Sequence, residues 1–152
     1  MPVSSPLHVV CPKCATTNRV LRERLAAANC GACKRPLFDG HPAELTASGF
    51  ERQVAASGVP LVVDFWAPWC GPCRMMAPAY EQAAARLEPR VRLAKLNTED
   101  APDIAARFGI RGIPTLIAFA DGREVGRQSG ALDMPGIVSF VKQHLGSSLN
   151  EQ

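Results

Sequence analysis

The sequence predicts an α/β fold with helices on both faces of a mixed sheet, preceded by a small segment that holds four of the six cysteines. Two observations predict it. Residues 41–152 alternate between short apolar runs, typical of buried strands, and stretches with apolar residues three or four apart, typical of helices. Residues 1–40 have few large apolar side chains and several Pro and Gly residues, so they need a covalent or metal link to fold. We therefore expect two units, 1–40 and 41–152.

The first elements after residue 40 are a helix, a strand and a longer helix. ELTASGFERQVAAS, residues 44–57, predicts a short helix that ends at Gly58. LVVDFWA, residues 61–67, is a continuous apolar run and is typical of a strand buried on both faces. A helix is predicted from Cys70 to Leu87, with one apolar side formed by Met75, Met76, Ala79, Tyr80, Ala83, Ala84 and Leu87.

The remaining elements complete the order β-α-β-α-β-β-α. VRLAKLN, residues 91–97, predicts a strand, and APDIAARFG, residues 101–109, predicts a short helix closed by its glycine. Residues 115–130 predict a hairpin with Asp121-Gly122 as its turn. The last helix is expected to be capped by Asp133, with an apolar stripe of Ile137, Val138, Val141 and Leu145.

Charge and hydropathy limit the partners and the location. The net charge is +3, and residues 1–50 carry six Lys and Arg against three Asp and Glu. So weak an excess favours a solvated surface over a nucleic-acid interface. No apolar run approaches the roughly 18 residues of a membrane span. The N-terminus lacks the basic start and apolar core of a secretory signal. We expect a cytoplasmic protein with no membrane partner, whose cysteines serve metal binding or redox catalysis.

The four N-terminal cysteines have the spacing of a metal site. Cys11 and Cys14 form one Cys-x-x-Cys pair, and Cys30 and Cys33 form the next after fifteen residues. This spacing is typical of a structural site in which four thiolates surround one Zn²⁺ and leave no open position. Two structural disulfides and an iron–sulfur cluster are the alternatives. His8 and His41 are expected to be ordinary surface residues, because four sulfurs fill the tetrahedron.

The third pair, Cys70 and Cys73, has a different context. It follows a predicted buried strand and opens a predicted helix, with Pro72 in the first turn. The free N–H groups and dipole at a helix start stabilise a thiolate, which makes Cys70 the better nucleophile. Cys73 is close enough to form a disulfide with it. The sequence thus predicts that four cysteines bind a metal and two react.

These residues also carry a family resemblance. WCGPC after VDFWA, with RGIPT about 40 residues later, closely resembles the thioredoxin family from about Leu45 to Leu145. With its four-cysteine segment the chain is similar to the zinc-containing second thioredoxins of bacteria. Pro68 stands where the family often has an acidic residue.

The resemblance implies roles for the catalytic residues. Cys70 would attack a substrate disulfide, and Cys73 would resolve the mixed disulfide. Asp64 resembles the buried carboxylate that takes the proton of the resolving thiol; the alternative is a hydrogen-bonded strand-edge aspartate. Lys95 resembles its charge partner; the alternative is a solvated strand lysine.

The resemblance also implies a surface for substrates. Pro114 resembles a cis-proline that faces the cysteines, where the sequence alone indicates only a proline that starts a strand. The expected surface for an extended peptide surrounds it and consists of Trp66, Trp69, Gly71, Pro72, Ile113 and Gly130.

The function implied is reduction of disulfide-containing proteins, with recharging by an NADPH-dependent thioredoxin reductase and no bound organic cofactor. A protein-disulfide oxidase or isomerase is the alternative within this class. A zinc-ribbon binding module on a thioredoxin scaffold is the alternative outside it. A third hypothesis makes the zinc site a switch that responds to oxidants.

Overall fold

The larger part of the protein is a five-stranded mixed sheet between two layers of helices. The computed structural model describes residues 6–149. The strand order is β3-β5-β4-β6-β7, with β3, β4 and β5 parallel and β6 and β7 antiparallel. The strands are β3 (Ala43–Glu44), β4 (Leu61–Trp66), β5 (Arg92–Asn97), β6 (Thr115–Ala120) and β7 (Arg123–Ser129).

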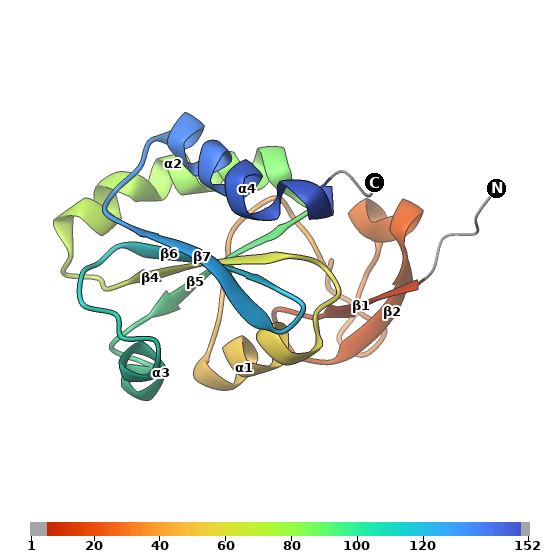
Figure 1. Cartoon of the computed structure of the whole chain (residues 1–152). Coiled ribbons are helices and arrows are strands. Elements are labelled where there is room, and N and C mark those ends of the chain that lie inside the picture. The colour runs from red at the N-terminus through yellow and green to blue at the C-terminus, as the bar shows by residue number, and fades with distance from the viewer. Residues whose placement is uncertain (1–5, 150–152) are drawn as a thin grey trace.

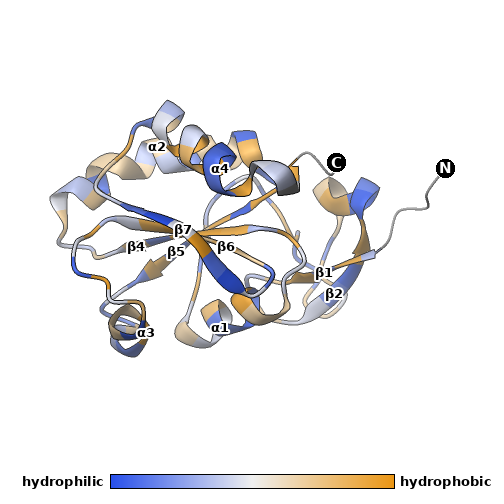
Figure 2. Cartoon of the chain, viewed as in Figure 1, coloured by the Kyte–Doolittle hydropathy of each residue, from blue (hydrophilic) through white to orange (hydrophobic). Residues whose placement is uncertain are grey.

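Two helices cover each face of this sheet (Figure 1). On one face lie α2 (Gly71–Leu87) and α4 (Met134–Leu149), and on the other α1 (Ala47–Ala56) and α3 (Pro102–Arg107). Five of the six residues of β4 are fully buried, as expected for a central strand with apolar side chains on both faces. Orange strands between helices of mixed colour show this pattern in Figure 2. The predicted fold class is confirmed.

Each face of the sheet has its own core. On the α1 and α3 side, the Phe50 ring meets Phe65, Phe108 and Phe119 edge-on, at centroid distances of 5.6–6.0 Å. Such pairs add about 0.5–1.5 kcal/mol each beyond the burial of area. On the other side the Tyr80 hydroxyl of α2 donates to the carbonyls of Ala94 at 2.8 Å and Val62 at 3.2 Å. Tyr80 thereby fixes α2 on β4 and β5.

The predicted first helix was wrong at its start. Ala43 and Glu44 form the short edge strand β3, which pairs with Ala94 and Lys95 of β5. The helix begins only at Ala47, because the Thr46 side chain accepts the Gly49 N–H at 3.0 Å and caps it. The later elements lie within a few residues of their predicted ranges.

The N-terminal segment is a small unit that docks on the sheet domain. An antiparallel hairpin of β1 (Pro6–Val10) and β2 (Thr17–Leu21) is followed by a 3₁₀ helix, η1 (Arg22–Ala27). Its apolar residues bury one another and also Val59 of the sheet domain; they are Val9, Cys11, Val20, Leu25, Cys30, Leu37 and Phe38. The segment therefore shares part of its small core with the domain.

No helix among the described residues is long and apolar enough to cross a membrane.

Candidate functional site

The cysteine pair of α2 lies where the central strand gives way to a helix. After β4, a turn closed by the Cys70 N–H to the Ala67 carbonyl at 3.1 Å leads into α2. Cys70 is the N-cap residue, and its sulfur accepts the Cys73 N–H at 3.2 Å. The two cysteines form a disulfide. A sulfur that caps a helix is stabilised as a thiolate once the disulfide is reduced.

The wall facing this disulfide comes from the start of β6. The Ile113–Pro114 peptide bond is cis, and the Ile113 carbonyl lies 3.6 Å from the Cys70 sulfur. The Pro114 carbonyl accepts the Gly130 N–H at 2.8 Å, and Gly130 has a φ of +99°, which disfavours other residues. Cys70 is only 4% exposed, because Trp66, Ala67 and Ile113 pack around the pair.

Trp69 forms the outer rim of the site. It is 65% exposed, and its indole N–H donates to Glu99 Oε2 at 2.7 Å. Trp69 is therefore a surface residue, and Glu99 fixes the orientation of its ring. Glu99 was not predicted from the sequence, because nothing in the local pattern of a turn after a strand indicates a partner thirty residues away.

Asp64 is a buried carboxyl on β4. It is 1% exposed, and neither oxygen has a hydrogen-bond partner among the described residues. It shares a sheet face with Val62, which packs under α2. Burial raises the pKa of Asp64 to about 7, although Lys95 lowers it. Lys95 is its register partner on β5, and the Lys95 ammonium lies 4.4 Å from the centroid of the Trp66 ring.

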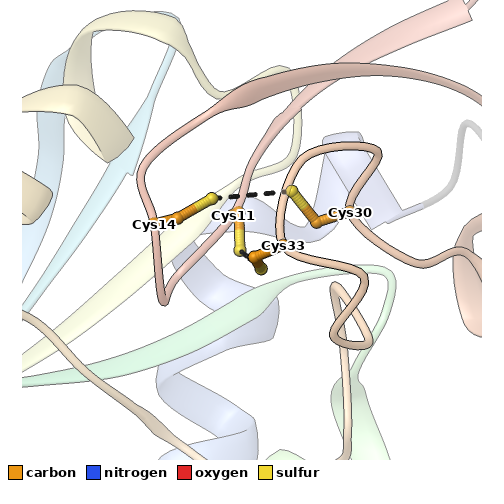
Figure 3. A group of neighbouring side chains, drawn as sticks. All are labelled: Cys11, Cys14, Cys30 and Cys33. Atoms are coloured by element: carbon orange, nitrogen blue, oxygen red, sulfur yellow. Dashed lines mark hydrogen bonds between the residues drawn. The ribbon is translucent and has the colours of Figure 1, made fainter.

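The four N-terminal cysteines converge from two turns of matching geometry. The sulfurs of Cys11, Cys14, Cys30 and Cys33 all lie within 4.8 Å of one another. In the first turn the Lys13 N–H donates to the Cys11 sulfur, and in the second the Ala32 N–H donates to the Cys30 sulfur, both at 3.4 Å. The sulfur pairs Cys11–Cys33 and Cys14–Cys30, each at 3.6 Å, join the two turns (Figure 3).

This donor set fits a tetrahedral metal ion. With metal–sulfur bonds of about 2.3 Å, the sulfurs of such a site lie about 3.8 Å apart. The pairs Cys11–Cys33 and Cys14–Cys30 lie 3.6 Å apart, and all four sulfurs lie within 4.8 Å of one another. Hydrogen bonding, chiefly from the Cys33 N–H, lowers the pKa of Cys30 to about 6, which favours a thiolate, whereas burial raises the pKa of Cys11 to about 11. His41 instead binds Glu81 at 2.7 Å.

The two cysteine sites lie at opposite ends of the domain. Cys70 caps the start of α2, whereas Glu88, just past its end, accepts the Gly40 N–H of the N-terminal segment at 3.2 Å. A helix of 17 residues is about 25 Å long. Within one molecule, Cys70 and the four N-terminal cysteines are therefore too far apart to exchange thiols.

Comparison with known proteins decides the family. The family model described as "Thioredoxin" matches residues 41–143. The chain belongs to the thioredoxin family. It is thus a thiol-disulfide oxidoreductase with the disulfide-reductase chemistry of thioredoxins, which act on disulfide substrates and are in general reduced by thioredoxin reductase.

Individual thioredoxins match over different spans. "Thioredoxin C-3" of Corynebacterium nephridii is 41% identical over 138 residues, covering 90% of this chain and 94% of that protein. That span is longer than residues 41–152, so the match extends into the four-cysteine segment. "Thioredoxin 1" of Nostoc sp. is 43% identical over 103 residues, covering 68% of this chain and 96% of that protein.

A solved structure supports the same fold. The crystal structure of chloroplastic thioredoxin z superposes with a TM-score of 0.63 at 28% identity, and covers 70% of this chain and 96% of that one. In this chain, Cys70 and Cys73 pack in one cluster with Trp66 and Ile113. Asp64 and Lys95 lie side by side on neighbouring strands.

Replacing Asp64 by Asn should change how the stability of this thioredoxin depends on pH. The pKa of Asp64 is raised from its ordinary value of 3.8 to about 7. Its stabilising contribution is therefore complete below about pH 4 and is lost as the pH rises through 7. At about 1.4 kcal/mol per pKa unit, the free energy of unfolding of Asp64→Asn relative to wild type should rise by roughly 4 kcal/mol between pH 3 and pH 8.

Urea unfolding of the oxidised proteins across this pH range measures the difference. Glu88, whose pKa burial also raises to about 7, is present in both proteins and cancels. The exposed Asp103→Asn is the matched control and should follow wild type. A constant difference between Asp64→Asn and wild type across the range would show that folding does not raise the pKa of Asp64.

Proposed function

We propose that this thioredoxin is a protein-disulfide reductase in which Cys70 attacks and Cys73 resolves. The observation that carries the assignment is the position of Cys70 as the cap of α2, where its sulfur accepts the Cys73 N–H. Both cysteines are almost fully buried, so exposure alone does not distinguish them. The position at the helix start distinguishes the two cysteines, because only the Cys70 sulfur accepts an N–H of the first turn.

The reaction is two consecutive thiol–disulfide exchanges. The Cys70 thiolate attacks one sulfur of the substrate disulfide, forms a mixed disulfide and releases the first substrate thiolate. The Cys73 thiolate then attacks the Cys70 sulfur and releases the second substrate thiolate. The substrate has gained two electrons, and the enzyme holds the Cys70–Cys73 disulfide seen in the structure. An NADPH-dependent thioredoxin reductase would restore the dithiol.

Asp64 is proposed to take the proton of Cys73. It lies on the face of β4 beneath α2, and its pKa of about 7 suits a group that exchanges protons near neutral pH. Lys95 is proposed to favour the ionised carboxyl, since its charge lowers the pKa of Asp64. Asp64→Asn should therefore slow the second exchange more than the first.

Substrates are proposed to bind as extended peptides across the rim of the disulfide. Trp69 is exposed beside it, and a Cβ added to Gly71 would meet no atom within 4 Å. The proposed surface consists of Trp69, Gly71, Pro72, Ile113, Pro114 and Gly130.

We place this reaction in the cytoplasm, where thiols are kept reduced. Cell fractionation that recovered the protein elsewhere would contradict this location.

Serine variants test the order of attack. Cys70→Ser should lower insulin-disulfide reduction at least about a thousandfold. Cys73→Ser should still attack but cannot resolve, so it should accumulate covalent adducts with disulfide substrates that a reductant releases. Non-reducing electrophoresis and mass spectrometry identify the adducts. The Cys70→Ser/Cys73→Ser double variant is the control, and adducts formed by Cys70→Ser alone would reverse the two roles.

We propose that residues 1–40 form a zinc-binding unit ahead of the thioredoxin domain, residues 41–152. Cys11, Cys14, Cys30 and Cys33 would hold one Zn²⁺. Support comes from the four converging sulfurs and the matching N–H to sulfur contacts of the two turns. With four protein ligands the metal would have no open position, so its chemistry would be structural. Oxidation of the thiolates would release it, and the distance from Cys70 means that any effect on catalysis would pass through the fold.

Zinc analysis tests this site. The purified protein should contain one zinc per chain, and replacing any of the four cysteines by Ser should remove it. Cys73→Ser is the matched control, since it removes a thiol elsewhere and should keep the metal. Graded peroxide should release zinc, followed with a colorimetric chelator. A full zinc content in Cys14→Ser or Cys30→Ser would contradict the assignment, and retention of zinc under peroxide would contradict the oxidant response.

A further inference from the structure

Arg92 is a charged side chain buried between the N-terminal segment and the sheet domain. It begins β5 and is 2% exposed. One guanidinium nitrogen donates to the Leu37 carbonyl at 2.9 Å and lies 3.5 Å from the Val10 carbonyl. The guanidinium carbon lies 4.1 Å from the centroid of the Phe38 ring. All three contacts are with residues of the N-terminal segment.

No carboxylate neutralises Arg92 at ion-pair distance. The ion pairs within 4.0 Å that the described residues form are His41–Glu81, Arg107–Glu51 and Arg127–Glu124. Glu88 is near enough to act on Arg92 through its charge, but its oxygens accept the N–H groups of Gly40 and Leu93. Arg92 Nε has no partner among the described residues. A buried charge left in this state destabilises the fold.

Arg92 lies against the backbone that leads into the cysteine cluster. Val10, whose carbonyl faces Arg92, directly precedes Cys11. The charge of Glu88 acts on Arg92 first, and that of Cys11 acts on it when the Cys11 thiol is ionised. Four thiolates around one divalent ion carry a net charge of −2. A cation held on the domain side of the interface is therefore more favourable when the metal-bound thiolates have formed.

We propose that Arg92 is the counter-charge of the four-cysteine site, so that metal binding and docking of the N-terminal segment onto the thioredoxin domain form one cooperative event. Arg92 is a positioning residue, which acts through the backbone next to Cys11 and contacts no reacting atom. The proposal rests on the metal site proposed above. Gln53 supports the same contact, because its side-chain amide donates to the Val10 carbonyl at 2.9 Å.

This role predicts that removing the charge of Arg92 changes the stability of the metal-loaded form and of the metal-free form in opposite directions. In the metal-loaded form the charge of Arg92 offsets that of the thiolates and stabilises the interface. In the metal-free form the charge of −2 of the metal-bound cluster is absent, and Arg92 keeps only its carbonyl acceptors on Leu37 and Val10 and the charge of Glu88. A residue that only filled space would stabilise both forms alike.

Three variants separate charge from packing. Arg92→Met removes the charge and keeps an unbranched side chain, whereas Arg92→Lys keeps the charge. Arg90→Met removes the same charge from an exposed side chain two residues away. Zinc affinity is measured by competition with a chelator, and thermal unfolding is followed for the metal-loaded and metal-free forms.

Arg92→Met should weaken zinc binding at least about tenfold, while its metal-free form unfolds no earlier than metal-free wild type. Arg92→Lys should stay within about threefold of wild-type affinity, and Arg90→Met should match wild type. Unchanged affinity in Arg92→Met, or equal destabilisation of both forms, would overturn the proposal. A wild-type protein that binds no zinc would overturn the metal site itself.

Hydrogen exchange of the wild-type protein gives an answer even if Arg92→Met does not fold. Removing zinc with a chelator should speed exchange in β1 and β2 and, in the same step, at the start of β5 and in α1. Faster exchange confined to the N-terminal segment would overturn the coupling.

Discussion

The central position of β4 is the constraint on which both cysteine sites depend. β4 pairs with β5 on one side and with β6 on the other. Its carboxyl end leads into Cys70, and because β6 is antiparallel, the start of β6 brings Ile113 and Pro114 to the same edge. β5 is parallel, so its first residue, Arg92, lies at the opposite edge, where the Arg92 N–H binds the Pro60 carbonyl just before β4. The reactive cysteines thus lie at the end of the sheet formed by the carboxyl end of β4, and the N-terminal segment docks at the opposite end.

One buried ionisable side chain is associated with each site. Asp64 lies on β4, the strand that leads to the reactive disulfide, and Arg92 contacts Val10, the residue before Cys11. Both are at least partly unsatisfied among the described residues. Burial acts on them in opposite senses: it raises the pKa of Asp64 to about 7 and lowers the pKa of Arg92 to about 10. Buried ionisable side chains without full hydrogen bonding destabilise the folded state, and they occur most often where a protein transfers protons or binds ions. Because the two sites are separated by the length of α2, a metal bound by the four cysteines would influence the disulfide only through the packing of the domain.

The parts of this structure that depend on neighbours in sequence could be predicted. The continuous apolar run of residues 61–67 predicted β4, and apolar residues three or four apart predicted α2. The spacing of Cys11, Cys14, Cys30 and Cys33 indicated a common site, because each Cys-x-x-Cys turn directs two sulfurs to one point. The start of the first helix was wrong, because pairing of Glu44 with β5 outweighed its helical preference. The contact of Trp69 with Glu99 and the burial of Arg92 were missed, since both join residues at least thirty positions apart in the chain. From the sequence alone, an arginine at the start of a strand is expected to be exposed to solvent. Its burial becomes evident only when the position of the N-terminal segment is known.

The central claim is that two sets of cysteines in one chain do different work: four hold a metal and two exchange disulfides. Differential alkylation tests it most directly. The reduced, zinc-loaded protein is treated briefly with iodoacetamide at pH 7, and the labelled positions are read by peptide mass spectrometry with and without a chelator. The account predicts that Cys70 is labelled first and that Cys11, Cys14, Cys30 and Cys33 become labelled only after the chelator is added. Labelling of these four cysteines as fast as Cys70 in the zinc-loaded protein would contradict it.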